Sequence, residues 1–129
     1  LVNDVSEREW QTEGTGQWVK GKSHDTYGPI GPYLVTKDEI KDFKNLNMAL
    51  DLNDQRMQTG NTKTMIFDVN EIVSYVSKFM TLNPGDIITT GTPPGVGMGK
   101  KPQLFLKDGD RLKLKIDNLG EQNSKVVTI

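Results

Sequence analysis

The chain has 129 residues, a formal net charge of −1 and 34% hydrophobic residues, which suffices for about one domain with a modest core. No basic stripe indicates nucleic acid, and no acidic tail indicates a solvating arm. The sequence contains no cysteine, which excludes disulfides and thiolate metal sites. No apolar run approaches the roughly 20 residues of a membrane helix, so we expect a soluble, cytoplasmic protein.

The first third of the chain is dominated by a polar loop. We expect residues 1–5 to end a strand and residues 6–11 to make one helical turn. Residues 20–32 then bring together two lysines, the only histidine, a carboxylate and two Gly-Pro pairs, with no amphipathic period. Gly-Pro pairs fix a turning backbone, and polar groups on such a path suit a binding site. A short strand over 33–36 is predicted to leave this loop.

The middle of the chain predicts a hairpin followed by a loop. Apolar and polar residues alternate over 46–52, which is the period of a half-buried strand. Asn53 and Asp54 form the turn, and residues 55–58 return as the partner strand. Residues 59–64 are predicted to be loop.

One clear helix follows this hairpin. Its apolar face is formed by residues at helical spacing, namely Ile72, Val73, Val76, Phe79 and Met80. Asp68 and Glu71 stand three residues apart in front of this face, in the manner of a capping box. The turn chemistry of 83–86 is predicted to terminate the helix.

The last third of the chain predicts three strands and a glycine-rich loop. Residues 87–90 are expected to form a buried strand that leads into the loop at 91–99. Alternation over 111–116 predicts a strand with one wet face, and residues 122–129 are its antiparallel partner. Many strands, one helix and long Gly/Pro loops predict an α+β fold, mostly β, in one domain over residues 1–129.

Two glycine-containing patterns resemble nucleotide-binding motifs, but the strand or helix that such motifs require is not predicted beside them. Residues 16–23 satisfy the phosphate-loop pattern, but the preceding segment is too polar for a buried strand. Pro29 and Pro32 lie where the following helix should run. Residues 95–99 lack the spacing of a dinucleotide loop and lead to Lys100, Lys101 and Pro102 instead of a helix. We therefore expect neither nucleotide site, although the amides beside Thr92 suit a carboxylate or phosphate oxygen.

Lys22 is the residue that the local sequence singles out. Trp18 and Val19 precede it and Gly-Pro turns follow, so a partly dry pocket around its ammonium is predicted, although an ordinary solvated lysine is an equal alternative. A lysine in such a pocket can stabilise developing negative charge. His24 lacks a second histidine or cysteine for a soft metal site, and a hydrogen-bonded loop histidine is favoured over a catalytic one.

Four stretches resemble the fumarylacetoacetate hydrolase superfamily, and together they span almost the whole chain. The first is Asn3-Asp4-Val5-Ser6 with Arg8 and Gln11, and the second is the loop over 21–29. The third is Gly60-Asn61-Thr62 with Met65-Ile66-Phe67. The fourth is the segment 89–97, Thr-Thr-Gly-Thr-Pro-Pro-Gly-Val-Gly.

The resemblance implies mixed β-sheets rolled into a barrel-like fold, usually as a homodimer, in an enzyme that cleaves, decarboxylates or isomerises 2-oxo acids and related dicarbonyl compounds. It implies Mg²⁺, Mn²⁺ or Ca²⁺ as cofactor, with Asp4 as a metal ligand. Lys22 is implied to contact the metal-bound substrate oxygen, Arg8 and Gln11 to lie near it, and Thr92 to hold the substrate carboxylate. This set of roles requires Asp4 and Lys22 to lie together.

The chain departs from the family pattern at several points. The family's other metal-binding glutamates and the lid His/Glu pair of its hydrolytic members lie upstream of the segment that matches Asn3-Asp4. We therefore expect the domain to be incomplete at its N-terminal side. His24 stands where the family usually has another aromatic residue. A non-catalytic binding or structural module that keeps the fold is the main alternative.

Overall fold

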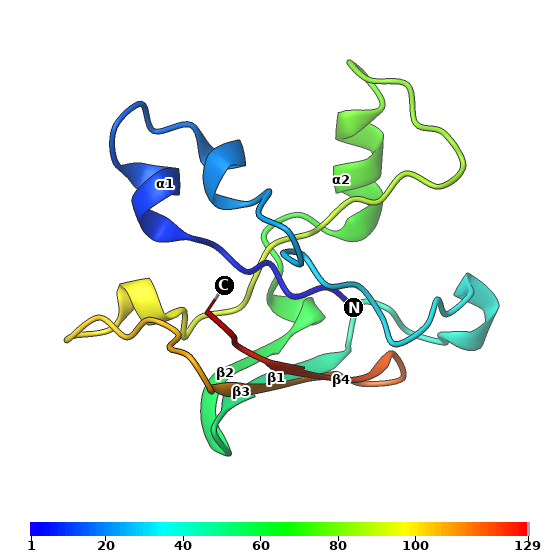
Figure 1. Cartoon of the computed structure of the whole chain (residues 1–129). Helices are drawn as coiled ribbons and strands as arrows, with labels where there is room; N and C mark the ends of the chain where they lie inside the picture. The colour runs from blue at the N-terminus through cyan, green and yellow to red at the C-terminus, as the bar shows by residue number, and fades with distance from the viewer. Residues whose placement is uncertain (129) are drawn as a thin grey trace.

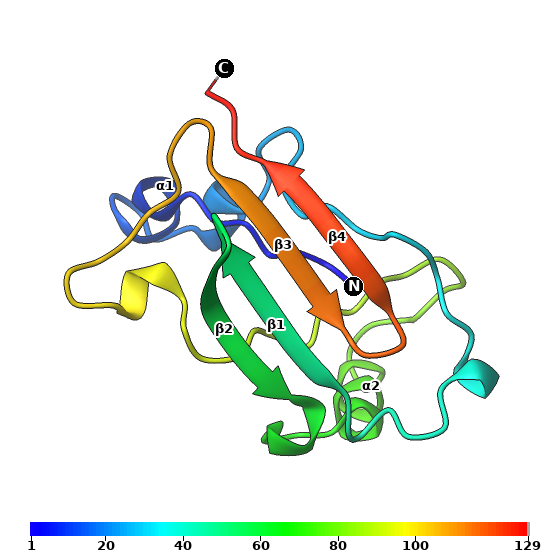
Figure 2. The same cartoon turned by 90° about the horizontal axis from the view of Figure 1, so that it is seen from below.

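The computed structural model describes residues 1–128. Four strands form one antiparallel sheet in the order β2-β1-β3-β4. Their bounds are β1 Asn47–Leu52, β2 Gln55–Asn61, β3 Arg111–Ile116 and β4 Gly120–Lys125. The helices and most of the connecting segments lie over one face of the sheet, and the opposite face is uncovered (Figures 1 and 2). This arrangement confirms an α+β chain in which the sheet is the main element.

Two short α-helices begin at acidic N-caps. Helix α1 covers Arg8–Thr12, and its cap Glu7 accepts hydrogen bonds from the backbone amides of Glu9 and Trp10. Helix α2 covers Val69–Val76 and begins at the predicted capping box of Asp68 and Glu71. Four short 3₁₀ segments complete the helical elements, η1 Trp18–Gly21, η2 Lys37–Glu39, η3 Thr62–Thr64 and η4 Gly97–Gly99.

A leucine cluster on the covered face of the sheet makes the core. Leu52 on β1 stands opposite Leu112 on β3, and Leu114 follows two residues later on the same face. All three are buried, and the half-buried Leu50 and Met57 pack against them. The lysines that alternate with these leucines on β3 are exposed. The predicted alternation over 111–116 is therefore confirmed, and its apolar face holds the sheet to the segments above it.

A β-bulge interrupts the pairing between β1 and β2. Leu50 pairs with Gln58, but the next residue, Asp51, pairs with Arg56, so Met57 is an extra residue on β2. Met57 packs against the leucine cluster, and its neighbour Gln58 is also buried. In a regular strand, neighbouring side chains face opposite sides. The extra residue thus lets two successive side chains point toward the covered face.

Several predictions from the sequence are corrected by the structure. The segments 33–36 and 87–90 are not strands, and Leu34 and Ile87 are exposed, because β-favouring residues form a strand only where another strand pairs with them. Conversely, the predicted loop over 59–64 is the end of β2 followed by η3. The last residue of the predicted strand over 122–129 lies outside the described residues.

The predicted helix face is only partly realised. Helix α2 ends at Val76, so Phe79 and Met80 lie beyond it and are 63% and 54% exposed. The rolled, barrel-like arrangement of mixed sheets is not seen either. Within residues 1–128 the sheet is purely antiparallel and open, with β2 and β4 as its edges.

The chain exposes a large surface for its mass. Its accessible area is 9729 Å², whereas a globular monomer of this mass exposes about 6,800 Å². Large apolar side chains contribute to this surface, and Leu34 and Ile66 are more than nine-tenths exposed. Among residues 1–128, no helix has the length and apolarity that a membrane span requires.

Candidate functional site

The N-terminal segment is held against the loop that follows η1. Val2 and Ile30 form an isolated antiparallel bridge. The amide of Asn3 donates to the carbonyl of Pro29 at 3.1 Å, and the amide of Gly31 donates to the carbonyl of Leu1 at 3.0 Å. These bonds bring two motifs of the sequence, one near residue 4 and one near residue 22, into the same region.

Helix α1 and segment η1 pack so closely that only glycine fits between them. The amide of Glu7 donates to the carbonyl of Gly21 at 2.9 Å. A Cβ atom on Gly21 would overlap the carbonyl oxygen of Glu7 and would lie 2.6 Å from the Cβ of Gln11. The contact therefore fixes Lys22, the next residue, relative to the N-terminal segment.

Asp4, Ser6 and Lys22 form what we call the Lys22 cluster. The Lys22 Nζ donates to Asp4 Oδ1 and to Ser6 Oγ, each at 2.7 Å. Ser6 Oγ in turn donates to the Asp4 carbonyl at 3.1 Å. The Lys22 side chain is 26% exposed and that of Asp4 is 49% exposed. An ammonium has three N–H donors, so one donor of Lys22 remains for an incoming oxygen atom.

Arg8 and Gln11 contact each other on α1. The Arg8 Nη1 donates to Gln11 Oε1 at 2.6 Å. Gln11 is only 1% exposed, and its buried Nε2 has no hydrogen-bond partner within the described part of the chain. Buried amide groups usually have a hydrogen-bond partner, so this nitrogen is an unsatisfied donor beside the predicted site.

Thr92 lies on a different segment and is held by β2. The Gln58 Nε2 donates to Thr92 Oγ1 at 2.9 Å and to the carbonyl of Pro93 at 3.0 Å. The loop lies close along this strand, since a Cβ on Gly60 would stand 2.5 Å from the Cβ of Pro93. In the described residues, no hydrogen bond joins Thr92 directly to the Lys22 cluster.

Two partners of the predicted site residues, Ser6 and Gln58, are not among the residues predicted from the sequence. Ser6 belongs to the same short motif as Asp4, and a hydroxyl two residues beyond the aspartate is a signal that could have been used. No local signal in the sequence distinguishes Gln58 from the other residues of the predicted returning strand. The β-bulge that lets it face the loop is a property of strand pairing, not of local sequence.

The predicted dry pocket around Lys22 is not formed by the residues that precede it. Trp18 is 65% exposed and Val19 is 61% exposed, so neither excludes water from the ammonium. His24 is an exposed loop residue whose ring lies 5.1 Å from that of Tyr27. Partial burial and the negative charge of Glu7 raise the pKa of the Tyr27 phenol.

The described residues do not supply a complete metal site. No group of three His, Cys, Asp or Glu side chains within residues 1–128 could hold an ion. Divalent cations such as Mg²⁺ and Ca²⁺ take about six or more oxygen ligands, whereas the Lys22 cluster holds one carboxylate, whose Oδ1 already accepts from Lys22. Asp4 can therefore contribute one ligand to such a site, and further ligands are required.

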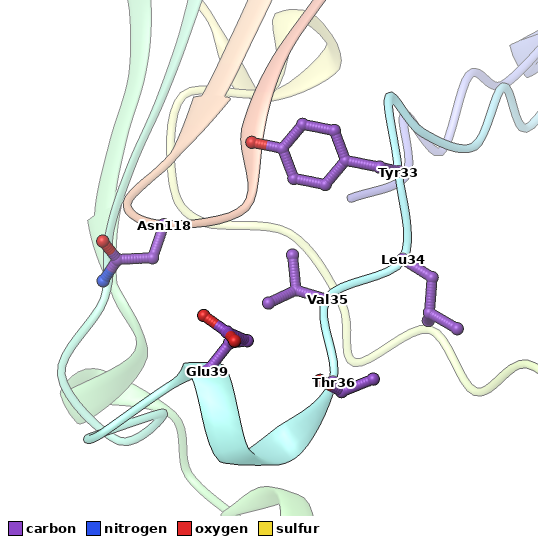
Figure 3. Close-up of a pocket in the computed structure, with 6 residues that line it drawn as sticks. All are labelled: Tyr33, Leu34, Val35, Thr36, Glu39 and Asn118. Atoms are coloured by element: carbon purple, nitrogen blue, oxygen red, sulfur yellow. The ribbon is translucent and has the colours of Figure 1, made fainter.

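One hollow of the described structure is lined by other residues. An open groove of about 430 Å³ is lined by Tyr33, Leu34, Val35, Thr36, Glu39 and Asn118. Figure 3 shows Val35 and Glu39 pointing into the groove, whereas Leu34 points away. The groove contains none of the predicted site residues and no cationic side chain. We therefore place the candidate site at the Lys22 cluster, where the reactive groups converge.

The phosphate-loop pattern over 16–23 does not form a phosphate loop. Its centre is the 3₁₀ segment η1, with no strand immediately before it and no helix after it. A phosphate site of this kind needs successive amides at the start of a helix. The segment thus lacks the strand–loop–helix arrangement of a phosphate loop.

The chain is similar to known proteins in both sequence and fold. The model of the fumarylacetoacetate hydrolase C-terminal family matches residues 1–127. A protein of Burkholderia cenocepacia, named only provisionally as a hydrolase, is 60% identical over 123 residues, which is 95% of this chain and 44% of that protein.

Two solved structures show the same fold. Fumarylacetoacetate hydrolase from Exiguobacterium antarcticum is 41% identical, with a TM-score of 0.95 over 99% of this chain and 46% of that one. The 2-hydroxyhepta-2,4-diene-1,7-dioate isomerase of Mycobacterium marinum is 40% identical, with a TM-score of 0.85 over 98% and 46%. The chain thus spans less than half the length of the relatives that it matches.

Proposed function

Since the chain belongs to the fumarylacetoacetate hydrolase family, we propose that it forms part of an enzyme that cleaves, decarboxylates or isomerises a 2-oxo acid or a related dicarbonyl compound. The family includes hydrolases and isomerases, as the two similar solved structures illustrate. Hydrolysis, decarboxylation and isomerisation of such compounds share one chemical demand, which is the stabilisation of an enolate oxygen.

The observation that carries the proposal is the fixed ammonium of Lys22. Asp4 Oδ1 and Ser6 Oγ occupy two of its donors, and the third can reach a substrate oxygen. When a bond to the carbon atom beside the ketone breaks, its electron pair forms an enolate whose negative charge lies largely on the ketone oxygen. The other fragment leaves as a proton, as CO₂ or as an acyl group that water takes up. A positive charge already held in place stabilises that oxygen without reorganising during the reaction. The ion pair with Asp4 contributes little stability at this exposure, so its role is to position Lys22.

The remaining roles are assigned by the same proposal. Thr92 holds the substrate carboxylate, and Arg8 and Gln11 bind substrate near Lys22. Asp4 is one ligand of Mg²⁺, Mn²⁺ or Ca²⁺, with the other ligands outside this chain's described residues. A bound cation of this kind would supply Lewis-acid polarisation of the ketone. We also propose a homodimer in the cytoplasm.

The test is an assay of the whole protein that contains these residues. Oxaloacetate or an acylpyruvate is supplied with Mg²⁺ or Mn²⁺, and turnover is expected that a chelator abolishes. The Lys22→Met variant is expected to lose about a hundredfold or more in kcat, while Lys20→Met, on an exposed neighbour, should retain it. Asp4→Ala should lose metal-dependent turnover but keep its unfolding temperature.

A non-catalytic module is the competing function. It would bind a dicarboxylate such as oxalate without converting any 2-oxo acid, and the Lys22→Met variant would then change binding alone. Absence of turnover with every substrate and metal supplied would favour this module and overturn the enzymatic proposal.

A further inference from the structure

We infer that Gln58 is a positioning residue that presents the hydroxyl proton of Thr92 to a carboxylate, and so sets the selectivity of this subsite for anionic acceptors. This inference rests on the proposed binding of the substrate carboxylate by Thr92. It concerns a residue whose side chain is buried behind that subsite and does not itself meet the ligand.

The orientation of the Gln58 amide follows from its two partners. Its nitrogen lies 3.0 Å from the carbonyl oxygen of Pro93 and 2.9 Å from Thr92 Oγ1. A carbonyl oxygen can only accept, so the NH₂ group, and not the amide oxygen, must face the loop. Both of its N–H donors are then directed at this segment. The hydroxyl oxygen of Thr92 is therefore an acceptor in its contact with Gln58.

This contact determines what Thr92 can offer to a ligand. A threonine hydroxyl carries one O–H donor and two acceptor lone pairs. An NH₂ group cannot accept, so the proton of Thr92 is left for another partner. Accepting a hydrogen bond also polarises the hydroxyl and strengthens it as a donor. Thr92 is exposed, so its proton is available to an incoming carboxylate oxygen.

The strand holds this arrangement in three places. Gln58 is 9% exposed and directly follows the bulged residue Met57. Gly95 lies so close to the Met57 carbonyl that a Cβ atom would overlap it, and its φ of 112° is one that other residues rarely adopt. Pro93 packs against Gly60. The loop can therefore move little relative to the amide, which makes the hydrogen bond a positioning contact.

Binding and turnover by the whole protein test the inference. Gln58→Met removes the donors at similar volume and is expected to raise the KM for oxaloacetate and the Kd for oxalate about fivefold to tenfold, with kcat nearly unchanged. Thr92→Val should raise both constants about tenfold or more. In the Thr92→Val background, Gln58→Met should change neither constant further, because the hydroxyl through which Gln58 acts has been removed. Gln55→Met, on an exposed glutamine of the same strand, is the matched control.

A second substitution separates positioning from simple loss of packing. Gln58→Glu supplies a carboxylate that accepts the Thr92 proton when ionised. At neutral pH its Kd for oxalate is expected to exceed that of Gln58→Met. As the pH falls and the introduced carboxyl gains a proton, this Kd is expected to decrease toward the parent value. A merely structural role would shift the unfolding temperature without this pH dependence.

Three results would overturn the inference. The first is a Gln58→Met effect that persists undiminished in the Thr92→Val background, and the second is an equal effect of Gln55→Met. The third is an unchanged oxalate Kd in Thr92→Val, which would also remove the proposed role of Thr92. Absence of turnover with intact, Gln58-dependent oxalate binding would instead reject the enzymatic proposal and leave the positioning role standing.

Discussion

Gly21 is the single residue on which the geometry of the Lys22 cluster most depends. It is the last residue of η1 and lies against α1, where its carbonyl accepts from the Glu7 amide and its missing side chain leaves room for Gln11. The next residue is Lys22, so any movement of η1 away from α1 also displaces the Lys22 ammonium. The bond to Asp4 and the bond to Ser6 both depend on this placement.

We expect Gly21→Ala to separate α1 from η1 and to weaken both the fold and the site. The added Cβ meets backbone of Glu7 and the Cβ of Gln11, neither of which can swing aside as the end of a flexible side chain could. The unfolding temperature of the whole protein should fall and kcat/KM should drop with it. Gly99→Ala is the control, because nothing lies within 4 Å of its added Cβ. An unfolding temperature unchanged in Gly21→Ala would contradict this close packing.

The residue-level predictions from the sequence succeeded in part. The required proximity of Asp4 and Lys22 is met by a 2.7 Å contact between them. The placement of Arg8 and Gln11 beside a bound substrate stays a prediction. Their chemical roles stay predictions. A partly dry pocket and a solvated lysine are equal alternatives in the sequence, and the Lys22 side chain is 26% exposed. The expected shielding by Trp18 is not seen, because adjacency in the sequence does not fix where the Trp18 ring lies. That depends on η1, whose 3₁₀ turn leaves Trp18 exposed.

Among the helices, strands and turns, the sequence correctly predicts those features that are stabilised by residues close together in the chain. The capping box of α2 and the turn at Asn53 and Asp54 both involve residues within a few positions of each other, and both are present. The failed strand predictions at 33–36 and 87–90 needed a partner strand from elsewhere in the chain. A β-favouring composition carries no information about that partner.

The acidic cap of α2 gives a pH-dependent prediction. A hydrogen bond from Lys44, followed by one from the Glu71 amide, lowers the pKa of Asp68. A carboxyl whose pKa is lower in the folded state stabilises the fold above its unfolded pKa of about 4. This contribution is lost as the pH falls through the folded pKa. The unfolding temperature of Asp68→Asn should therefore lie below that of the parent at pH 6 and approach it at strongly acidic pH.

The matched control for this experiment is Asp54→Asn. Asp54 lies in the β1–β2 turn with a positive φ of 65°, a conformation that asparagine also tolerates. Its unfolding temperature, measured beside that of Asp68→Asn at each pH, controls for the general effect of replacing an aspartate by asparagine. A gap between Asp68→Asn and the parent that stays constant from neutral to acidic pH would contradict the assignment.

On the scale of the whole molecule, a small core supports a large surface. Only four hydrophobic residues are buried in the described chain, Leu46, Leu52, Leu112 and Leu114, and the exposed area of 9729 Å² exceeds the value of about 6,800 Å² for a globule of this mass. Large apolar side chains such as Ile66 and Phe67 remain in water. The stability of the sheet therefore depends heavily on each buried leucine.

We expect Leu112→Ala to be strongly destabilising. Removal of a buried leucine side chain costs about 2–5 kcal/mol, which is a large share of the roughly 5–15 kcal/mol that stabilises a typical domain. Leu112 is 6% exposed and stands opposite Leu52. Urea unfolding followed by circular dichroism measures the loss. Lys115→Ala, at an exposed position of the same strand, should unfold near the parent midpoint, and a similar shift in both variants would count against this core.

The extra residue at Met57 bears on how gaps should be interpreted when related chains are aligned. Without that residue, Leu50 would still face Gln58 and Asp51 would still face Arg56, so a one-codon deletion could leave the hairpin continuous and its turn unmoved. The shortened strand would lose the Met57 side chain that packs against the leucine cluster and the Met57 carbonyl that borders Gly95. A homologue with a single-residue gap here would keep the hairpin. The loop that carries Thr92 would then have to be held against β2 by other contacts.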